Sequence, residues 1–466
     1  MPFTLTSLGD AQEVTGSCHL LTVQGHDILL DCGMHQGSDA VSRMKKERFQ
    51  FDPRRIRAVV LSHAHLDHSG LLPKLVRKGF RGPIYCTGPT RNLLAVMLED
   101  SANIYFRDLE HQNLRRKRRG QRVQKPEYEM EDVLHVLEQC QALEYYQKVQ
   151  AAPGVDVTFH DAGHILGSAV VDLHIDDGIR AKHLVFSGDL GNDTGVLMRD
   201  PDVPAEADLV LMESTYGNRD HRPLEDTLTE FEAVLQKARD DTGVVLMPAF
   251  AVGRTQELLF HLGCLYHQGK LEGWRVFLDS PMAIEVTRLY DQWMDTFSEE
   301  DQQRLRHRKA RTLEEFLPVL SLTSSVEESV QLNRIEGGAI IIAGSGMYNG
   351  GRIRHHFKHR LWRKDTYVVF AGFQARGTMG RQLVEGAQFV RIFGQRYVNN
   401  AQVYTLGGFS AHAGRNQLLA WAARFPEHTQ FRLVHGEPES LTALAHNLRQ
   451  AGRDVTIAEP GSIHEF

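Results

Sequence analysis

Short apolar runs recur along the chain and alternate with amphipathic stretches. Many of these runs are apolar on both faces, which is typical of strands that are covered on two sides. They predict strands at 26–33, 57–63, 183–190, 208–215, 243–250, 338–345, 366–373 and 431–437. Apolar residues with helical spacing occupy 69–80, 253–269 and 415–425. The alternation of strands and helices predicts a layered α/β architecture.

The size and composition of the chain are those of a soluble globular protein. It has 466 residues, which predicts two domains, and 42% of them are hydrophobic. No apolar run approaches the ~20 residues needed to span a bilayer, and the start, MPFTLTSLGD, does not resemble a secretory signal. The five cysteines are scattered and lack CxxC spacing, which fits a reducing compartment and argues against a thiolate zinc site. We therefore expect a cytoplasmic protein with no membrane association.

The charge pattern favours local rather than global contact with polyanions. The net charge is -6, so the whole chain does not attract nucleic acid. Basic residues nevertheless concentrate in three segments, 107–125, 304–311 and 352–364. Each segment alone could be a solvated face. Three of them in an acidic chain favour local contact with a polyanion.

The stretch SHAHLDHSG (62–70) carries the strongest chemical signal. It places His63, His65, Asp67 and His68 directly after the predicted strand at 57–63, where open α/β sheets usually have their sites. Alternate spacing directs these side chains to two sides, so they can serve two ions. Imidazole and carboxylate ligands suit zinc, and a structural zinc site would normally recruit cysteine. The alternative, a histidine-rich loop without function, leaves this density of ligands unexplained.

Three further residues stand in places where metal ligands are common. His164 lies in a glycine-flanked turn, DAGHILGSA (161–169), whereas Asp189 and His435 each follow a predicted strand. Each of them alone is more typical of a turn or a helix cap. Together with the first cluster they predict a metal centre.

These motifs resemble those of the metallo-β-lactamase superfamily: HxHxDH at 63–68, GHxxGS around His164 and SGD around Asp189. The resemblance implies that His63, His65 and His164 bind one zinc ion. It implies that Asp67, His68 and His435 bind a second zinc ion and that Asp189 bridges the two. It also implies that Asp31 supports the HxHxDH loop through hydrogen bonds without being a ligand.

Further motifs resemble the β-CASP group, the nucleic-acid-processing branch that includes bacterial RNase J and the nuclease subunit of the eukaryotic cleavage and polyadenylation specificity factor. They are Glu213 in MESTYG, His412 in GGFSAHA and His435 in HGE. A histidine at the last motif is typical of the RNA-processing members. The resemblance implies an α/β fold with a four-layer αββα metallo-β-lactamase domain at 1–208 and 398–466, interrupted by a β-CASP domain at 209–397. It also implies that the extra terminal domains of some relatives are missing here.

The resemblance implies a zinc-dependent ribonuclease that hydrolyses single-stranded RNA and leaves 5'-phosphate and 3'-hydroxyl ends. Two zinc ions would lower the pKa of a bound water from ~15.7 to ~7 and neutralise phosphate oxygens. Asp67 belongs to this catalytic centre. We expect His412 to be the general acid and Glu213 to orient it and keep it protonated. A role for His412 in phosphate binding alone is the alternative.

Glycine-rich stretches supply candidate RNA contacts. GSGMYNGGR (344–352) and GFQARGTMGR (372–381) are similar to stretches of these nucleases, and glycine lets backbone N–H groups approach a phosphate. The candidates are Ser345, Gly346, Arg352, Arg376 and Arg381. A plain strand-to-helix turn is the alternative. We expect His355, His356 and His359 to be surface residues.

Competing functions remain open at this stage. A catalytically inactive RNA-binding scaffold would typically have lost ligands, and every ligand position is filled here. A small-molecule metallo-hydrolase would not explain Glu213 and His412, and the histidine of HGE disfavours a DNA nuclease. The sequence leaves open the balance of endonuclease and 5'-3' exonuclease action and the oligomeric state, a homodimer included.

Overall fold

The chain folds into two compact units in a computed structural model. The structure describes residues 3–35, 40–344, 351–372, 374 and 378–466. Unit 1 comprises 1–193, 199–220 and 412–466, and unit 2 comprises 194–198 and 221–411. Unit 2 is thus an insertion, and the chain returns to unit 1 just before His412.

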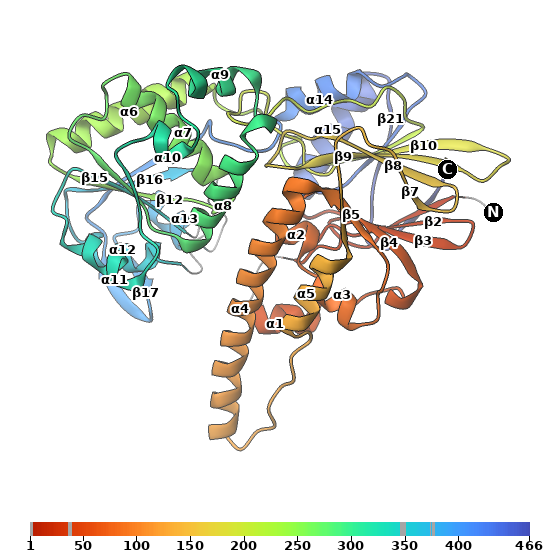
Figure 1. Cartoon of the computed structure of the whole chain (residues 1–466), viewed down its shortest axis with the longest axis horizontal. Coiled ribbons are helices and arrows are strands. Elements are labelled where there is room, and N and C mark those ends of the chain that lie inside the picture. Colours follow the sequence, from red (N-terminus) through yellow and green to blue (C-terminus); the bar gives the residue numbers. More distant parts are fainter. Residues whose placement is uncertain (1–2, 36–39, 345–350, 373, 375–377) are drawn as a thin grey trace. The chain divides into compact units, whose positions relative to one another are not determined.

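Two seven-stranded sheets form the centre of unit 1 (Figure 1). The first has the order β22-β1-β2-β3-β4-β5-β6, and the second has the order β21-β20-β11-β10-β9-β8-β7. Strands of the first sheet are β1 Thr4–Ser7, β2 His19–Val23, β3 His26–Leu30, β4 Ile56–Val60, β5 Ile84–Thr87, β6 Cys140–Leu143 and β22 Ile463–Glu465. Strands of the second are β7 Val149–Ala152, β8 Val155–Asp161, β9 Ala169–Asp176, β10 Ala181–Phe186, β11 Leu209–Met212, β20 Gln430–Leu433 and β21 Asp454–Ile457.

Alternation along each strand places side chains on the two faces of a sheet. On β10, Leu184 and Phe186 join the core between the two sheets, whereas Val185 joins the outer core under α14 and α15. Helices α3, α4 and α5 lie on the side of the first sheet. The layers therefore run helix, sheet, sheet, helix, and the predicted αββα arrangement is confirmed. The helices of unit 1 are α1 Ala40–Lys46, η1 Pro53–Arg55, α2 Leu66–Ser69, α3 Leu72–Arg77, α4 Gly88–Arg118, α5 Met130–Gln139, α14 Arg415–Ala423 and α15 Pro438–Gln450.

The candidate site residues gather because their strands end at one edge. β3 and β4 run parallel, and so do β10, β11 and β20. Asp31, the 62–68 loop, Asp189, Glu213 and His435 all follow the carboxyl ends of these strands. β9 runs antiparallel to β10, so the loop that carries His164 and precedes β9 comes to the same edge.

Unit 2 is built on a six-stranded parallel sheet with the order β14-β13-β15-β12-β16-β19. Its strands are β12 Val244–Pro248, β13 Arg275–Leu278, β14 Leu320–Leu322, β15 Ala339–Ala343, β16 Thr366–Ala371 and β19 Gln402–Leu406, and a separate hairpin joins β17 Phe389–Ile392 and β18 Gln395–Val398. Its helices are α6 Leu224–Asp240, α7 Arg254–His267, α8 Pro281–Gln292, η2 Met294–Thr296, α9 Glu299–His307, α10 Leu313–Phe316, α11 Val326–Gln331, η3 Leu332–Arg334, α12 Ile353–Arg360 and α13 Met379–Val384. Both faces of β12 and β15 are buried, by side chains of the α6/α7 side and of the α12/α13 side.

In the described part of the chain, none of the helices has both the length and the apolar character that a membrane crossing requires.

Candidate metal centre

Asp31 holds the HxHxDH loop in place. Its carboxylate accepts hydrogen bonds from the backbone N–H of Ser62 at 2.8 Å and from the Ser62 hydroxyl at 2.8 Å. Its Oδ2 also lies 2.6 Å from Nδ1 of His68. The backbone of Asp67 adds a further anchor, because its carbonyl accepts from Ser17 N–H at 2.7 Å. Asp31 therefore fixes which ring nitrogen of His68 remains directed to the site.

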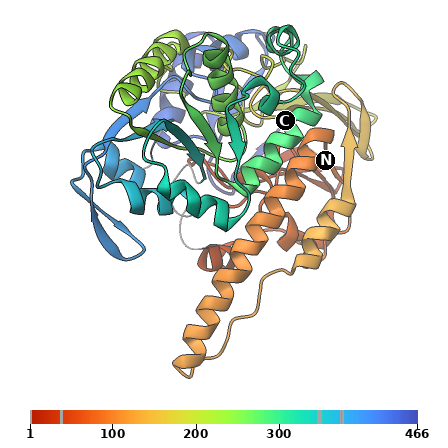
Figure 2. The ribbon, with the colours of Figure 1, turned by 60° about the vertical axis from the view of Figure 1, so that its left-hand side comes forward.

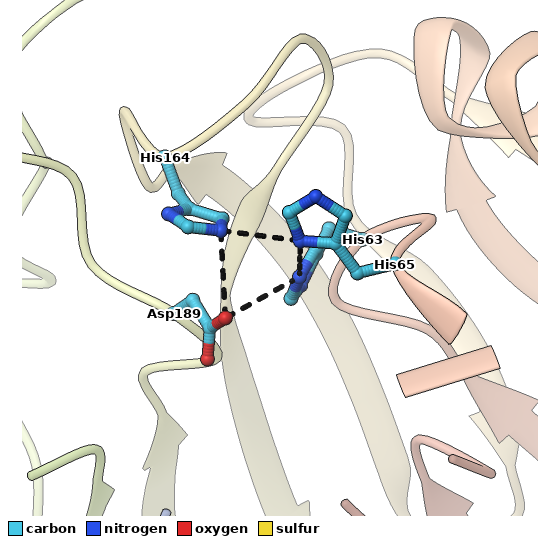
Figure 3. Close-up of side chains that lie close together, drawn as sticks. All are labelled: His63, His65, His164 and Asp189. Atoms are coloured by element: carbon cyan, nitrogen blue, oxygen red, sulfur yellow. Dashed lines mark hydrogen bonds and ion pairs between the residues drawn. The ribbon is translucent and has the colours of Figure 1, made fainter. Parts of the chain in front are cut away.

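One group of ligand atoms contains His63, His65, His164 and Asp189, and Figure 3 shows these side chains converging. Nε2 of His63 lies 3.1 Å from Nδ1 of His65, and Nε2 of His164 lies 3.3 Å from the same atom. Asp189 Oδ2 lies 3.5 Å from His63 Nε2 and 3.4 Å from His164 Nε2. Three nitrogens and one oxygen within 4.8 Å of one another are the donor set that zinc prefers.

A second group contains Asp67, His68 and His435, again with ligand atoms within 4.8 Å of one another. The other oxygen of Asp189, Oδ1, lies 3.3 Å from His68 Nε2 and 3.5 Å from His435 Nε2. Both Asp189 Oδ1 and His68 Nε2 are buried, and neither makes a hydrogen bond among the residues described. Buried polar atoms that make no hydrogen bond are costly unless an ion satisfies them. The residues present therefore fit a cation on each side of Asp189.

Asp10 is a site residue that the sequence did not reveal. Its Oδ2 lies 3.3 Å from Nδ1 of His435, and its backbone carbonyl accepts from His435 N–H at 3.0 Å. Its other oxygen lies 3.2 Å from Nε2 of the buried His19. A carboxylate on the far nitrogen of a ligating histidine fixes its tautomer and ring orientation. The only sequence signal is an acidic residue three positions after a strand, which is too common to single out.

Three of these residues have backbone conformations that residues other than glycine rarely adopt. Asp10, Asp31 and His435 have φ values of 46°, 59° and 49°. Such conformations persist where the surrounding structure imposes them, and they cluster at functional sites. In each case the tight turn after a strand directs the side chain back into the site.

The pKa shifts divide the histidines into two classes. Burial lowers the pKa of His63 well below its usual value and lowers the pKa of His65 to about 4, so both rings are neutral at pH 7. Neutral imidazole is the form that binds metals. Burial also opposes a charge on His435, but Asp189 and Asp10 outweigh it and raise the pKa of His435 to about 9. The carboxylates on this side attract positive charge, as those of a cation site do.

His412 and Glu213 lie beside the first group. Glu213 is fully buried, accepts from Leu190 N–H at 2.7 Å, and has Oε1 3.4 Å from Nδ1 of His412. Burial disfavours protonated His412, but the charge of Glu213 and the contact with it raise the pKa of His412. The His412 ring is about a quarter exposed, at 24%. Asp189, Glu213 and His412 also come within 4.8 Å of one another, so this geometry admits a cation as well as a proton donor.

The candidate RNA contacts belong to unit 2. Three of them lie outside the described residues, and the other two contact neighbouring side chains. Ser345, Gly346 and Arg376 lie outside the described residues. Arg352 donates to Asp279 at 2.7 Å and to the Thr323 carbonyl at 2.9 Å. Arg381 pairs with Glu385 at 2.7 Å. Arg352 is therefore engaged in holding the ends of the sheet strands together.

The prediction that His356 is a surface residue is wrong. Its side chain is buried, and its Nε2 lies 2.6 Å from Asp279 Oδ2. The basic segment 352–364 forms α12, and His356 lies on the face of this helix that packs on the sheet. Polar residues share this helix face, so the sequence did not predict the burial of His356. The buried imidazole is satisfied by Asp279, which is far away in the sequence.

Family models match three parts of the chain. A metallo-beta-lactamase superfamily domain matches 20–180, a Beta-Casp domain matches 255–383, and a Zn-dependent metallo-hydrolase RNA specificity domain matches 397–458. With the αββα layers and the His/Asp cluster, these matches define the class as metal-dependent hydrolases of the metallo-β-lactamase superfamily. The chain belongs to the β-CASP family of that superfamily, since it is 41% identical over 98% of both chains to Ribonuclease TTHA0252 of Thermus thermophilus.

Other relatives extend the comparison. The chain is 31% identical, over 96% of its length, to transcription termination factor FttA of Methanocaldococcus jannaschii, and it covers 69% of that protein. It is 32% identical to FttA of Methanosarcina mazei, of which it covers 68%. A solved structure of a protein of unknown function from Enterococcus faecalis V583 aligns over all of both chains with a TM-score of 0.56 and 12% identity. That last similarity concerns the fold alone.

Proposed function

We propose that this chain is a two-zinc ribonuclease that hydrolyses phosphodiester bonds of single-stranded RNA and leaves 5'-phosphate and 3'-hydroxyl ends. The observation that carries the proposal is the position of Asp189. Its Oδ2 faces His63 and His164, whereas its Oδ1 faces His68 and His435. A carboxylate with one oxygen toward each ligand group is the arrangement expected of a bridge between two ions.

The relatives support RNA as the substrate. The bacterial relative is named a ribonuclease, and the C-terminal family model is described as an RNA specificity domain. Zinc ions bound by the two groups would supply a hydroxide near neutral pH and neutralise the phosphate oxygens. A nucleophile from water removes the need for the 2'-hydroxyl, which is why we expect 5'-phosphate products.

The residues of the chain have separate roles in this proposal. His63, His65 and His164 would hold one ion, and Asp67, His68 and His435 would hold the other. Asp31 fixes the ring of His68, and Asp10 fixes that of His435. His412 donates a proton to the leaving 3'-oxygen, and Glu213 keeps His412 protonated and orients its ring.

Metal analysis and RNA cleavage together test the proposal. Purified protein should contain two zinc ions per chain by elemental analysis and should cleave single-stranded RNA until a chelator is added. Asp67→Ala should lower both zinc content and cleavage. Active protein that contains no zinc, or full cleavage by Asp67→Ala, contradicts it. Zinc-loaded protein that binds RNA without cleaving it would instead identify an RNA-binding scaffold.

The role of His412 needs a test of its own. His412→Ala should lower turnover by about 10²–10⁴-fold, the usual contribution of general acid catalysis, while two zinc ions remain bound. If the variant loses a zinc ion, His412 is a ligand together with Glu213 and Asp189. If KM alone rises, His412 binds phosphate without transferring a proton.

Labelled RNA distinguishes the modes of cleavage. We propose chiefly endonucleolytic cleavage, which gives discrete long fragments from internally labelled RNA. Release of mononucleotides from 5'-labelled, 5'-monophosphorylated RNA would reveal 5'-3' exonuclease action. Cleavage of single-stranded DNA at an equal rate would contradict the choice of RNA.

A further inference from the structure

The outer end of α4 and the segment that follows it form a projection, called here the basic arm and defined as residues 113–125. Figures 1 and 2 both show it extending beyond α1, α3 and α5 of unit 1. Buried side chains of α4 end at Leu109, and the next buried residue along the chain is Tyr128. All residues between these two are described, so the arm adds no side chain to the core of unit 1.

Polar hydrogen bonds give the basic arm a defined structure without a core. The Asn113 side chain donates to the Gln124 carbonyl at 2.9 Å and accepts from Gln124 N–H at 2.7 Å. Arg116 Nε donates to the Arg122 carbonyl at 2.7 Å. The returning segment is thus tied to α4 along its length, which keeps the surface of the arm in one arrangement.

The basic arm carries a concentrated positive charge. The arm contains seven cations and no acidic residue, in a chain whose net charge is -6. Six of the seven cations are exposed, and Arg116 is partly buried. None of the ion pairs in the described residues includes a cation of the arm. The seven cations are Arg115, Arg116, Lys117, Arg118, Arg119, Arg122 and Lys125.

In the other two basic segments, several cations are engaged in contacts within unit 2, whereas Arg308, Lys309 and Arg311 are exposed. In 304–311, Arg304 pairs with Glu300 and Arg306 donates to the Gln302 side chain. In 352–364, Arg352 binds Asp279, Arg360 donates to two backbone carbonyls, and Arg363 pairs with Asp365. The basic arm differs from both segments, because none of its cations forms an ion pair among the described residues.

We propose that the basic arm binds the phosphate backbone of the RNA strand whose cleavage site lies in the metal centre. This inference rests on the proposed function and adds a second point of contact to it. Contacts between arginine or lysine and phosphate are independent of sequence, so the arm supplies affinity and orientation rather than selectivity.

The geometry of α4 connects the arm to the metal centre. Hydroxyls of Thr87 and Thr90, at the start of the helix, donate to the carbonyl of Gly167 at 2.6 Å and 2.7 Å. Gly167 lies in the loop that carries His164, and the next residue, Ser168, accepts from His164 N–H at 3.0 Å. From Gly88 to Arg115 the helix rises about 40 Å. One stiff element thus begins at the site and ends in the basic arm.

The composition of the arm favours RNA over other polyanionic or apolar partners. A helix that lies on a membrane has aromatic or leucine residues on one face, whereas the arm has no aromatic residue. Its exposed large apolar side chains are Leu114 and Val123, each next to an arginine in the sequence. The centre of a protein interface is depleted of charge, so these two side chains do not suit one.

Four substitutions in the arm test the proposal: Arg115→Gln, Lys117→Gln, Arg118→Gln and Arg119→Gln. Binding is measured in the Asp67→Ala background with a 40-nucleotide single-stranded RNA over a range of salt concentrations, so the result does not depend on cleavage. We expect about 10- to 100-fold weaker binding at 0.1 M salt and a fall of up to ~3 in the slope of log K against log salt. Hydrolysis of bis(p-nitrophenyl) phosphate by the otherwise unchanged protein should stay the same, because this substrate reaches only the metal centre.

Matched controls separate charge from position and fold. A variant that removes four exposed cations of unit 1 outside the arm, Lys46, Arg57, Lys78 and Arg424, should keep the affinity and the salt slope. Arg115→Lys, Arg118→Lys and Arg119→Lys together should restore most of the binding. Equal loss in the arm and control variants overturns the proposal. RNA binding that is unchanged in the arm variant also overturns the proposal. If binding to phosphatidylserine vesicles is lost in that variant while RNA binding is unchanged, the arm binds a membrane instead. A parent that binds RNA through the arm yet cleaves none would overturn the proposed function and leave this inference standing.

Discussion

At the scale of single residues, Asp10 lies outside the proposed ligand set and yet contacts one of the proposed ligands, His435. It contacts His435 through both its carboxylate and its backbone carbonyl, and His19 contacts its other oxygen. Asp10→Asn keeps the size of the side chain and removes its charge. We expect zinc affinity at the His435 side to fall by about 10- to 100-fold. Titration with a competing chelator and the spectrum of the cobalt-substituted protein measure this.

A surface carboxylate provides the control for Asp10. Asp52→Asn lies outside the site and should leave both measurements unchanged. Unfolding experiments on metal-free protein establish that Asp10→Asn still folds. If zinc affinity and the cobalt spectrum match those of the parent, Asp10 does not position His435.

Asp291 gives a prediction about stability and pH. Burial, the largest influence, raises its pKa to about 7, although its carboxylate accepts from Leu313 N–H at 2.8 Å. Because the folded pKa exceeds the unfolded value of 3.8, the folded state holds this proton more tightly. Stability is therefore full below about pH 4 and falls as the pH rises to about 7.

Asp291→Asn should remove that loss while keeping the hydrogen bond through the amide oxygen. The gain should be near zero at pH 4 and should reach at least about 1 kcal/mol at pH 8. That corresponds to a rise of roughly 2–4 °C in the melting temperature of unit 2. Melting curves at several pH values measure the difference. A gain that does not change with pH would contradict the shifted pKa of Asp291.

At the scale of elements, the apolar runs predicted eight strands and missed others, among them the fully buried β5. All eight predicted strands are present, as are the helices at 253–269 and 415–425. The antiparallel strands β7, β8 and β9 were not predicted, because their partly exposed positions interrupt the apolar runs. The 31 residues of α4 were not predicted either, because its outer end buries no side chain and therefore has no apolar period.

The junction between α4 and the His164 loop makes a further prediction. Gly167 has φ +80°, and a Cβ there would lie 2.6 Å from Thr90 N and 2.8 Å from Thr87 Oγ1. Gly167→Ala should push the loop off the helix start, move His164 and weaken zinc binding at the first group. We expect a measurable loss of zinc affinity and of RNA cleavage, together with a lower melting temperature.

Gly178 is a matched control for that junction. It has the same φ of +80°, but a Cβ there would meet nothing within 4 Å. Gly178→Ala thus carries the backbone strain without the steric clash. It should lower stability slightly and leave zinc affinity unchanged. Equal effects of the two substitutions on zinc affinity would show that strain, and not displacement of His164, is responsible.

At the scale of the whole molecule, the chain brings together residues that are hundreds of positions apart. The resemblance of the motifs around His63, His164, Asp189 and His435 to those of a known superfamily predicted which residues meet. It did not predict how they are held. The positive φ values of Asp10, Asp31 and His435 and the pairing of Asp10 with His19 depend on the folded backbone. Arg352 and His356 likewise both contact Asp279. Asp279 is far from them in the sequence, so the residues around them did not predict these contacts.

Because every proposed zinc ligand belongs to unit 1, metal removal should act on the two units differently. Ions that bind only the folded state stabilise it, by about 4.1 kcal/mol at a thousandfold excess over Kd. Unit 2 has its own parallel sheet and its own buried cores. We therefore expect calorimetry to show two transitions, of which a chelator lowers one and leaves the other in place. In Asp67→Ala the chelator should move the first transition less than in the parent. If both transitions shift together in the parent, the two units unfold as one, and zinc stabilises the molecule as a whole.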